Sequence, residues 1–144
     1  MLTNLGLGSL LVSLTVIIHT FGLIALSRAM PWIIHWFSLH RHAAGKVVAM
    51  VATVLGIFVL HTVEVWTWAA AFALVGAFPT FGDALYFSTV TFSTVGYGDI
   101  TLSHDWRLFG SLEGINGFIL IGWSTAFLVA ASVRYGPFRT GEHF

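Results

Sequence analysis

The stretch TVGYGD, residues 94–99, decides the fold of this chain because it suits neither a regular helix nor a regular strand. Gly96 and Gly98 each weaken a helix or strand by about 0.5–1 kcal/mol relative to alanine. Long apolar runs stand before and after the stretch. The chain therefore places an irregular backbone segment within a hydrophobic sequence, and the surroundings of that segment indicate what it does.

The composition is that of an integral membrane protein. Hydrophobic residues make up 57% of the 144 residues and charged residues only 8%, whereas soluble domains carry about 25% charged residues. Six basic and six acidic residues give a formal net charge of zero, so nothing indicates nucleic-acid binding. The absence of cysteine excludes disulfides and cysteine-ligated metal centres.

Three apolar runs, at 5–26, 47–78 and 108–133, are each long enough to cross a bilayer, which takes about 20 residues. The first run could be a cleaved signal peptide, but no Lys or Arg precedes it and it exceeds a typical hydrophobic core of such a peptide. We therefore expect an uncleaved span. From Pro31 onward, aromatic residues at helical spacing predict a short amphipathic helix in the headgroup plane.

A short helix is predicted over 81–92, directly before the irregular stretch. Thr80 followed by Asp83 resembles a capping box with Asp at the acidic position. A helix of this length measures about 18 Å and cannot cross a bilayer. Irregular backbone within a membrane is tolerated only where protein buries it or where it lines a watery cavity. The helix and the stretch after it therefore form a re-entrant loop.

The carbonyl groups of this loop can replace water around a cation. If the carbonyls of Thr94, Val95, Gly96 and Tyr97 point to one axis, they form stacked rings of oxygen, and the Val95 and Tyr97 side chains point away from the axis. Such carbonyls need alternating backbone conformations, and glycine reaches positive φ without steric cost, which accounts for Gly96 and Gly98. One chain supplies one sector of each ring, so several copies are required.

The stretch TVGYGD resembles the selectivity filter of potassium channels. DALYFSTVTFS, residues 83–93, resembles their pore helix, and RLFGSLEGINGFILIGWSTAFLVAA, residues 107–131, resembles their inner helix. The resemblance covers about residues 45–134 and is to the small bacterial and two-pore-domain type. It implies an all-α membrane protein with three transmembrane helices per subunit, a re-entrant pore helix and filter loop, and a homotetramer in membrane lipid.

The resemblance also implies a division of the chain and a function. Residues 1–28 form an extra N-terminal span, 29–46 a basic interfacial segment, 47–134 the pore module and 135–144 a short cytoplasmic tail. Within the module we expect an outer helix at 47–78, the pore helix at 81–92, the filter at 94–98 and an inner helix at 107–133. The implied protein is a passive K⁺ channel, not an enzyme, with no cofactor besides the permeant ion.

Individual residues take roles from the same resemblance. K⁺ would be bound by the filter carbonyls and the Thr94 hydroxyl, and Asp99 would concentrate cations at the outer mouth. Gly117 matches the glycine at which inner helices bend, although glycine in membrane helices also serves close packing. Some relatives carry a buried acid at position 90, which is Val90 here. The candidates for lining the inner cavity are Phe118, Ile121, Thr125 and Val129. The candidates for supporting the filter are Tyr86 and Glu113.

Further titratable residues leave alternatives open. Glu113, within the last span, is either functional or hydrogen-bonded to Ser88 or Thr91 of the pore helix. His61 and Glu64 share a helix face, which favours a hydrogen bond over a metal site, because a metal needs more ligands. A final set, His35, His40 and His42, could sense cytoplasmic pH or contact lipid headgroups.

The distribution of basic residues predicts the orientation. Only Arg107 lies between the second and third long runs, so the basic loop and the C-terminus are expected in the cytoplasm and the N-terminus outside. The expected location is a plasma membrane, namely a bacterial inner membrane. The basic residues expected on the cytoplasmic side are Arg28, Arg41, Lys46, Arg134 and Arg139.

Two rival functions are a subunit of a cation transporter and a non-conducting accessory subunit.

Overall fold

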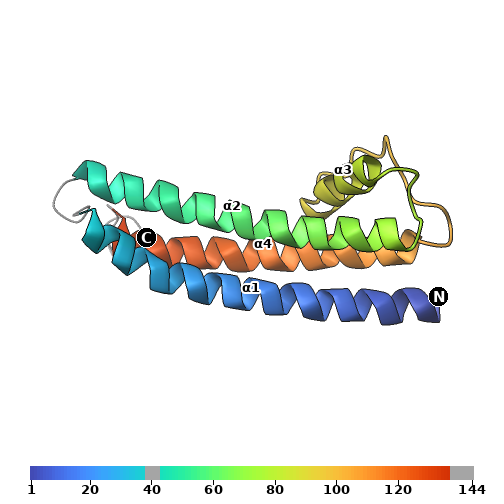
Figure 1. Ribbon diagram of the computed structural model, residues 1–144, viewed down its shortest axis with the longest axis horizontal. Helices are drawn as coiled ribbons and strands as arrows, with labels where there is room; N and C mark the ends of the chain where they lie inside the picture. Colours follow the sequence, from blue (N-terminus) through green and yellow to red (C-terminus); the bar gives the residue numbers. More distant parts are fainter. Residues whose placement is uncertain (38–42, 137–144) are drawn as a thin grey trace.

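The fold, obtained as a computed structural model, is described for residues 1–37 and 43–136, and every regular element in these residues is a helix. The elements are α1 (Leu2–Trp36), α2 (Ala43–Leu74), α3 (Phe81–Phe92) and α4 (Arg107–Tyr135). Figure 1 shows α1, α2 and α4 side by side, with the short α3 at the end where the N-terminus lies. By length and apolar composition, α1, α2 and α4 can each cross a membrane. The prediction of an all-α membrane protein is confirmed.

Helix α1 is longer than the sequence predicted. It runs without a break through the expected boundary at residue 28 and contains Pro31. The prediction of a separate interfacial helix from Pro31 onward is therefore wrong. Proline removes one backbone hydrogen bond, but membrane helices tolerate this where neighbouring groups compensate. Met30 is only 1% exposed, so packing holds the turn just before the proline. Trp32 and Trp36 stack on each other, with ring centroids 5.4 Å apart.

Helix α2 begins and ends earlier than expected, covering Ala43–Leu74 rather than 47–78. Its end is fixed by Gly76, which has φ 65°. The Gly76 amide donates to the Ala73 carbonyl and the Ala77 amide to the Phe72 carbonyl, at 3.1 and 2.9 Å. This pair of bonds is a Schellman motif, which terminates a helix at a residue in the left-handed conformation. Helix α4 starts where predicted and ends two residues later.

Helix α1 packs along α2 and α4 through small residues. A Cβ atom on Gly8 would lie 2.3 Å from Cδ1 of Leu112 on α4, and one on Gly22 would lie 2.3 Å from Cδ1 of Leu60 on α2. Both glycines therefore let large side chains from α2 and α4 lie directly against the α1 backbone, the usual device for close helix packing in membranes. The sequence alone did not indicate where α1 docks.

Two polar contacts fix α1 against the last helix and the loop before it. The Asn4 side chain donates to the Asp105 carbonyl at 2.6 Å. The Asn116 side chain of α4 donates to the Thr15 hydroxyl of α1 at 2.7 Å, where both residues are buried. Side-chain hydrogen bonds between helices are worth about 1 kcal/mol in membranes. They set the position of α1 along α4.

An aromatic cluster holds α3 against the long helices. Phe72 of α2 lies 5.3 Å from Phe87 of α3 and 5.1 Å from Phe109 of α4, both edge-to-face between ring centroids. Trp68 packs beside Phe109 at 5.3 Å and is fully buried. Aromatic pairs in this geometry add about 0.5–1.5 kcal/mol beyond the area they bury. The cluster therefore positions the short helix, and with it the segment that follows.

Candidate functional site

The short helix α3 delivers the chain to residues 94–99. It begins and ends at the predicted residues, Phe81 and Phe92. The Thr80 hydroxyl oxygen accepts from the Asp83 amide at 3.1 Å, as the capping prediction requires. At the other end, the Phe92 carbonyl lies against Gly117 of α4 so closely that a Cβ there would be 2.1 Å from the oxygen. The end of α3 is therefore fixed against the last span.

Every second residue of the stretch has a left-handed backbone. Gly96 has φ 58° and Gly98 φ 75°, as the sequence predicted for both glycines, and Thr94 has φ 61°. Positive φ in a β-branched residue is rare and costs on the order of 1–3 kcal/mol. Sequence reasoning missed Thr94 because it assigned this conformation to glycine only. The signal that could have found it is the period of two, since carbonyls that point the same way require alternate residues to invert.

The first three backbone amides of the stretch are hydrogen-bonded, whereas its carbonyls are not. The Val95 and Gly96 amides donate to the Val90 carbonyl at 3.0 and 3.2 Å, and the Thr94 amide donates to the Thr91 carbonyl at 3.0 Å. Within the described part of the chain, no carbonyl of residues 94–98 accepts a backbone hydrogen bond. A row of carbonyls without protein donors can bind water or a desolvated cation.

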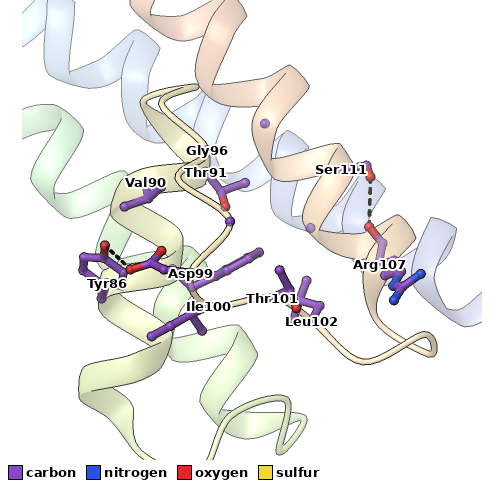
Figure 2. Close-up of a pocket in the computed structure, with 14 residues that line it drawn as sticks. Tyr86, Val90, Thr91, Gly96, Asp99, Ile100, Thr101, Leu102, Arg107 and Ser111 are labelled. Carbon is purple, nitrogen blue, oxygen red and sulfur yellow. Dashed lines mark hydrogen bonds between the residues drawn. The ribbon is translucent and has the colours of Figure 1, made fainter.

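The two side chains between the inverted residues are uncovered by this chain. Val95 is 52% exposed and Tyr97 72%. Behind the stretch lies a cavity of about 480 Å³ between α3, residues 96–102 and the start of α4. Figure 2 shows Arg107 and Ser111 on the α4 side of this cavity, opposite Tyr86 and Asp99. A single chain therefore leaves the stretch unsupported on the side of its large side chains.

Tyr86 supports the outer end of the stretch. Its hydroxyl donates to the Asp99 carboxylate at 2.7 Å, drawn as a dashed line in Figure 2. This bond lowers the pKa of Asp99 below its ordinary value and raises the pKa of the Tyr86 phenol, because it favours the charged carboxylate. Val90, one turn further along α3, carries no acid that could pair with Asp99. Tyr86, on the same helix as Val90, is thus the residue that hydrogen-bonds the Asp99 carboxylate.

Glu113 supports α3 from behind. It is fully buried on α4, and the Ser88 hydroxyl of α3 hydrogen-bonds its Oε1. The same hydroxyl lies 2.9 Å from the Val65 carbonyl of α2. One serine therefore links three helices, and the sequence-based alternative in which Glu113 hydrogen-bonds Ser88 agrees with this geometry. The second carboxyl oxygen, Oε2, is buried with no hydrogen-bond partner.

The candidate cavity residues lie on α4 beyond this contact. Phe118 is 71% exposed and Val129 46%, and Thr125 is exposed as well. Ile121 differs, because it is half-buried against the aromatic core. Three of the four residues therefore share a face that this chain leaves uncovered. Helix α4 is continuous through Gly117, and the contact with Phe92 gives this glycine a packing role whether or not the helix bends there.

The remaining predicted site residues are histidines and Glu64, which lie away from the irregular stretch. His35 is exposed near the end of α1, whereas His40 and His42 lie outside the described residues. The expected His61–Glu64 contact is present, at 2.8 Å between Nδ1 and Oε2. His19 of α1 joins it, with Nδ1 2.8 Å from Oε1 of Glu64. Nothing in the local sequence indicates this partner, because it lies 45 residues away on another helix.

Comparison with known proteins identifies a family for the part of the chain that contains the irregular stretch. No curated protein and no solved structure matches the chain. One family model, described as an ion channel, matches residues 58–134, which include the second half of α2, all of α3, the irregular stretch and α4 up to Arg134. The match covers more than half of the 144 residues and contains the irregular stretch. The chain therefore belongs to this family of ion channels.

Proposed function

We propose that the protein is a potassium-selective channel in which four identical chains surround one pore. K⁺ sheds its water, passes along rings built from the carbonyls of residues 94–97 and the Thr94 hydroxyl, and moves passively down its gradient. The observation that carries the proposal is the alternation of positive φ at Thr94, Gly96 and Gly98 in a segment whose carbonyls accept no backbone hydrogen bond within the described residues. This alternation is the backbone requirement for carbonyls that face one axis.

Uncovered surface supports the tetramer. Among the described residues, Val95 keeps 52% and Tyr97 72% of its surface exposed, so at least half of each is left without cover by its own chain. Neighbouring subunits would supply that cover and would bring four filter segments around one axis. Phe118, Thr125 and Val129 would then line the inner cavity. Four α3 helices would aim their C-terminal ends, at Ser93, toward the axis, where their negative dipole ends favour a cation.

The charge pattern supports the orientation proposed for this chain in a plasma membrane, with the N-terminus outside and the C-terminus in the cytoplasm. Figure 1 shows α3 and the N-terminus at one end of the helix bundle and the C-terminal end of α4 at the other. In this orientation the Tyr86–Asp99 pair lies at the outer mouth. The Asp99 charge would raise the local concentration of cations there.

Ion flux into liposomes tests the proposal, with purified protein and no partner present. We expect K⁺ flux well above Na⁺ flux for the wild type. Gly96→Ala should abolish K⁺ selectivity, because an alanine at φ 58° is strained by about 1–2 kcal/mol and this strain is relieved by rotating the carbonyls. Gly6→Ala is the matched control, since a Cβ on Gly6 meets no atom within 4 Å and its φ is ordinary.

Four outcomes would contradict the proposal. Equal K⁺ and Na⁺ flux through the wild type would refute selectivity, and a particle without fourfold symmetry would refute the tetramer. Absence of flux from the folded, purified protein would favour an accessory or transporter subunit that needs a partner. If Gly96→Ala kept the selectivity of the wild type, the alternating backbone conformation would not be required for selectivity.

A further inference from the structure

The cluster formed by His19, His61 and Glu64 joins the extra helix α1 to α2 inside the membrane-spanning part of the protein. Each side chain offers one ligand atom, and these atoms lie within 4.8 Å of one another. His19 and Glu64 are fully buried, and His61 is 19% exposed. Two imidazoles and one carboxylate form a recurrent protein site for Zn²⁺ and related ions, in which water occupies the remaining position.

We propose that His19, His61 and Glu64 bind one divalent transition-metal ion, of the Zn²⁺ class, in each chain. The spacing of His61 and Glu64 by three residues places both side chains on one face of α2, so both can reach the same ion. His19 supplies the third ligand from α1. Ligands of tetrahedral Zn²⁺ lie about 3.3 Å apart, given bonds of about 2.0–2.1 Å. The His–Glu distances of 2.8 Å would widen by about 0.5 Å, and ligand atoms that lie up to 4.8 Å apart would approach one another by about 1.5 Å.

Glu64 is a carboxylate buried within a membrane span, and such a group needs a compensating positive charge. Each of its oxygens lies 2.8 Å from an imidazole nitrogen, Oε1 from His19 and Oε2 from His61. A divalent ion held by the three side chains supplies the positive charge between them.

The surroundings of the cluster suit a bound ion that ties elements together. The His19 ring lies 5.2 Å from Trp123 of α4, and the His61 ring lies 5.7 Å from Phe92 at the end of α3, between centroids. Apolar walls of this kind exclude water and strengthen metal–ligand bonding. His61 and Glu64 lie within the family match and His19 lies outside it. The ion would therefore fix α1 to the channel module beside the end of the pore helix.

Metal binding to the purified, tag-free full chain tests this inference without any measurement of ion flux. Protein stripped with a chelator is titrated with Zn²⁺, and bound metal is measured by mass spectrometry after gel filtration. We expect about one Zn²⁺ per chain in the wild type and in the control His104→Gln, which removes an exposed histidine outside the cluster. His19→Gln and Glu64→Gln should weaken binding at least about tenfold.

A second measurement covers the case in which a variant misfolds. Co²⁺ added to the stripped wild type should give the intense visible absorption of a four- or five-coordinate site, and Zn²⁺ should displace it. Zn²⁺ should also raise the melting temperature of the wild type and of His104→Gln. Absence of stoichiometric binding, a weak octahedral Co²⁺ spectrum, or equal binding by folded His19→Gln would overturn the inference.

Discussion

Gly117 on α4 and Phe92 at the end of α3 meet backbone to backbone. A Cβ on Gly117 would lie 2.1 Å from the Phe92 carbonyl oxygen and 2.8 Å from its carbonyl carbon. Neither atom belongs to a flexible side chain, so the clash cannot be relieved by a rotamer change. The glycine is therefore required for α3 to end where it does.

Gly117→Ala should separate α3 from α4 and reduce both stability and K⁺ flux. Overpacking of a close contact costs about 1–3 kcal/mol, and a clash with rigid backbone belongs at the upper end of that range. The melting temperature of the purified protein should fall clearly. Gly122→Ala is the control on the same helix, because a Cβ there meets no atom within 4 Å. Equal melting temperatures for the two variants would show that the contact tolerates a methyl group.

Ser88→Ala should destabilise the protein by leaving Glu113 without its hydrogen-bond donor. A buried polar group that loses its partner costs about 1–3 kcal/mol, and Oε2 of Glu113 already has none. The measurement is thermal unfolding in detergent. In the control Ser111→Ala, the lost hydroxyl is exposed and bonds only the Arg107 carbonyl of its own helix, so a change within about 0.5 kcal/mol is expected. A Ser88→Ala effect no larger than that of the control would refute the role of this bond.

Tyr86→Phe should change how the proposed channel responds to acid outside. The Tyr86 hydrogen bond lowers the pKa of Asp99, so the wild-type carboxylate keeps its charge, and the stabilisation from the bond, until pH falls below the ordinary carboxyl range. Without the hydroxyl the pKa rises toward its ordinary value. K⁺ flux should then decline at a higher external pH than in the wild type.

Asp99→Asn serves as the reference for that titration, because it removes the charge at every pH. Its flux should be lower near neutral pH and should lose the acid-dependent decline. If Tyr86→Phe titrates at the same pH as the wild type, the hydrogen bond does not control the charge at the outer mouth.

Thr15→Val should loosen α1 from α4. The Thr15 hydroxyl accepts from Asn116 at 2.7 Å in a buried site, and its removal leaves the Asn116 amide unpaired at a cost of about 1 kcal/mol. Thr20→Val is the matched control, since that hydroxyl donates only to the Val16 carbonyl of its own helix. We expect a lower melting temperature for Thr15→Val alone. Indistinguishable melting curves would mean that apolar contacts suffice to dock α1.

The sequence by itself determined the elements of this protein. Run length and hydropathy predicted three spans, and the Thr80–Asp83 cap predicted the start of α3 at its observed residue. The glycine pattern predicted positive φ at Gly96 and Gly98. These features could be read because each depends on residues close together in the chain. Helix ends were less certain: Pro31 did not end α1, since packing around Met30 holds the turn before it.

Only the tertiary structure decided which helix faces meet. The contacts of His19 with Glu64 and of Gly117 with Phe92 join residues on different helices. In a soluble protein, polar residues mark the outer face of a helix and so reveal its rotation. In a membrane protein both lipid-facing and buried faces are apolar, so periodicity does not fix rotation or depth. Shape complementarity and a few buried polar contacts set them, and these arise only when the helices are assembled.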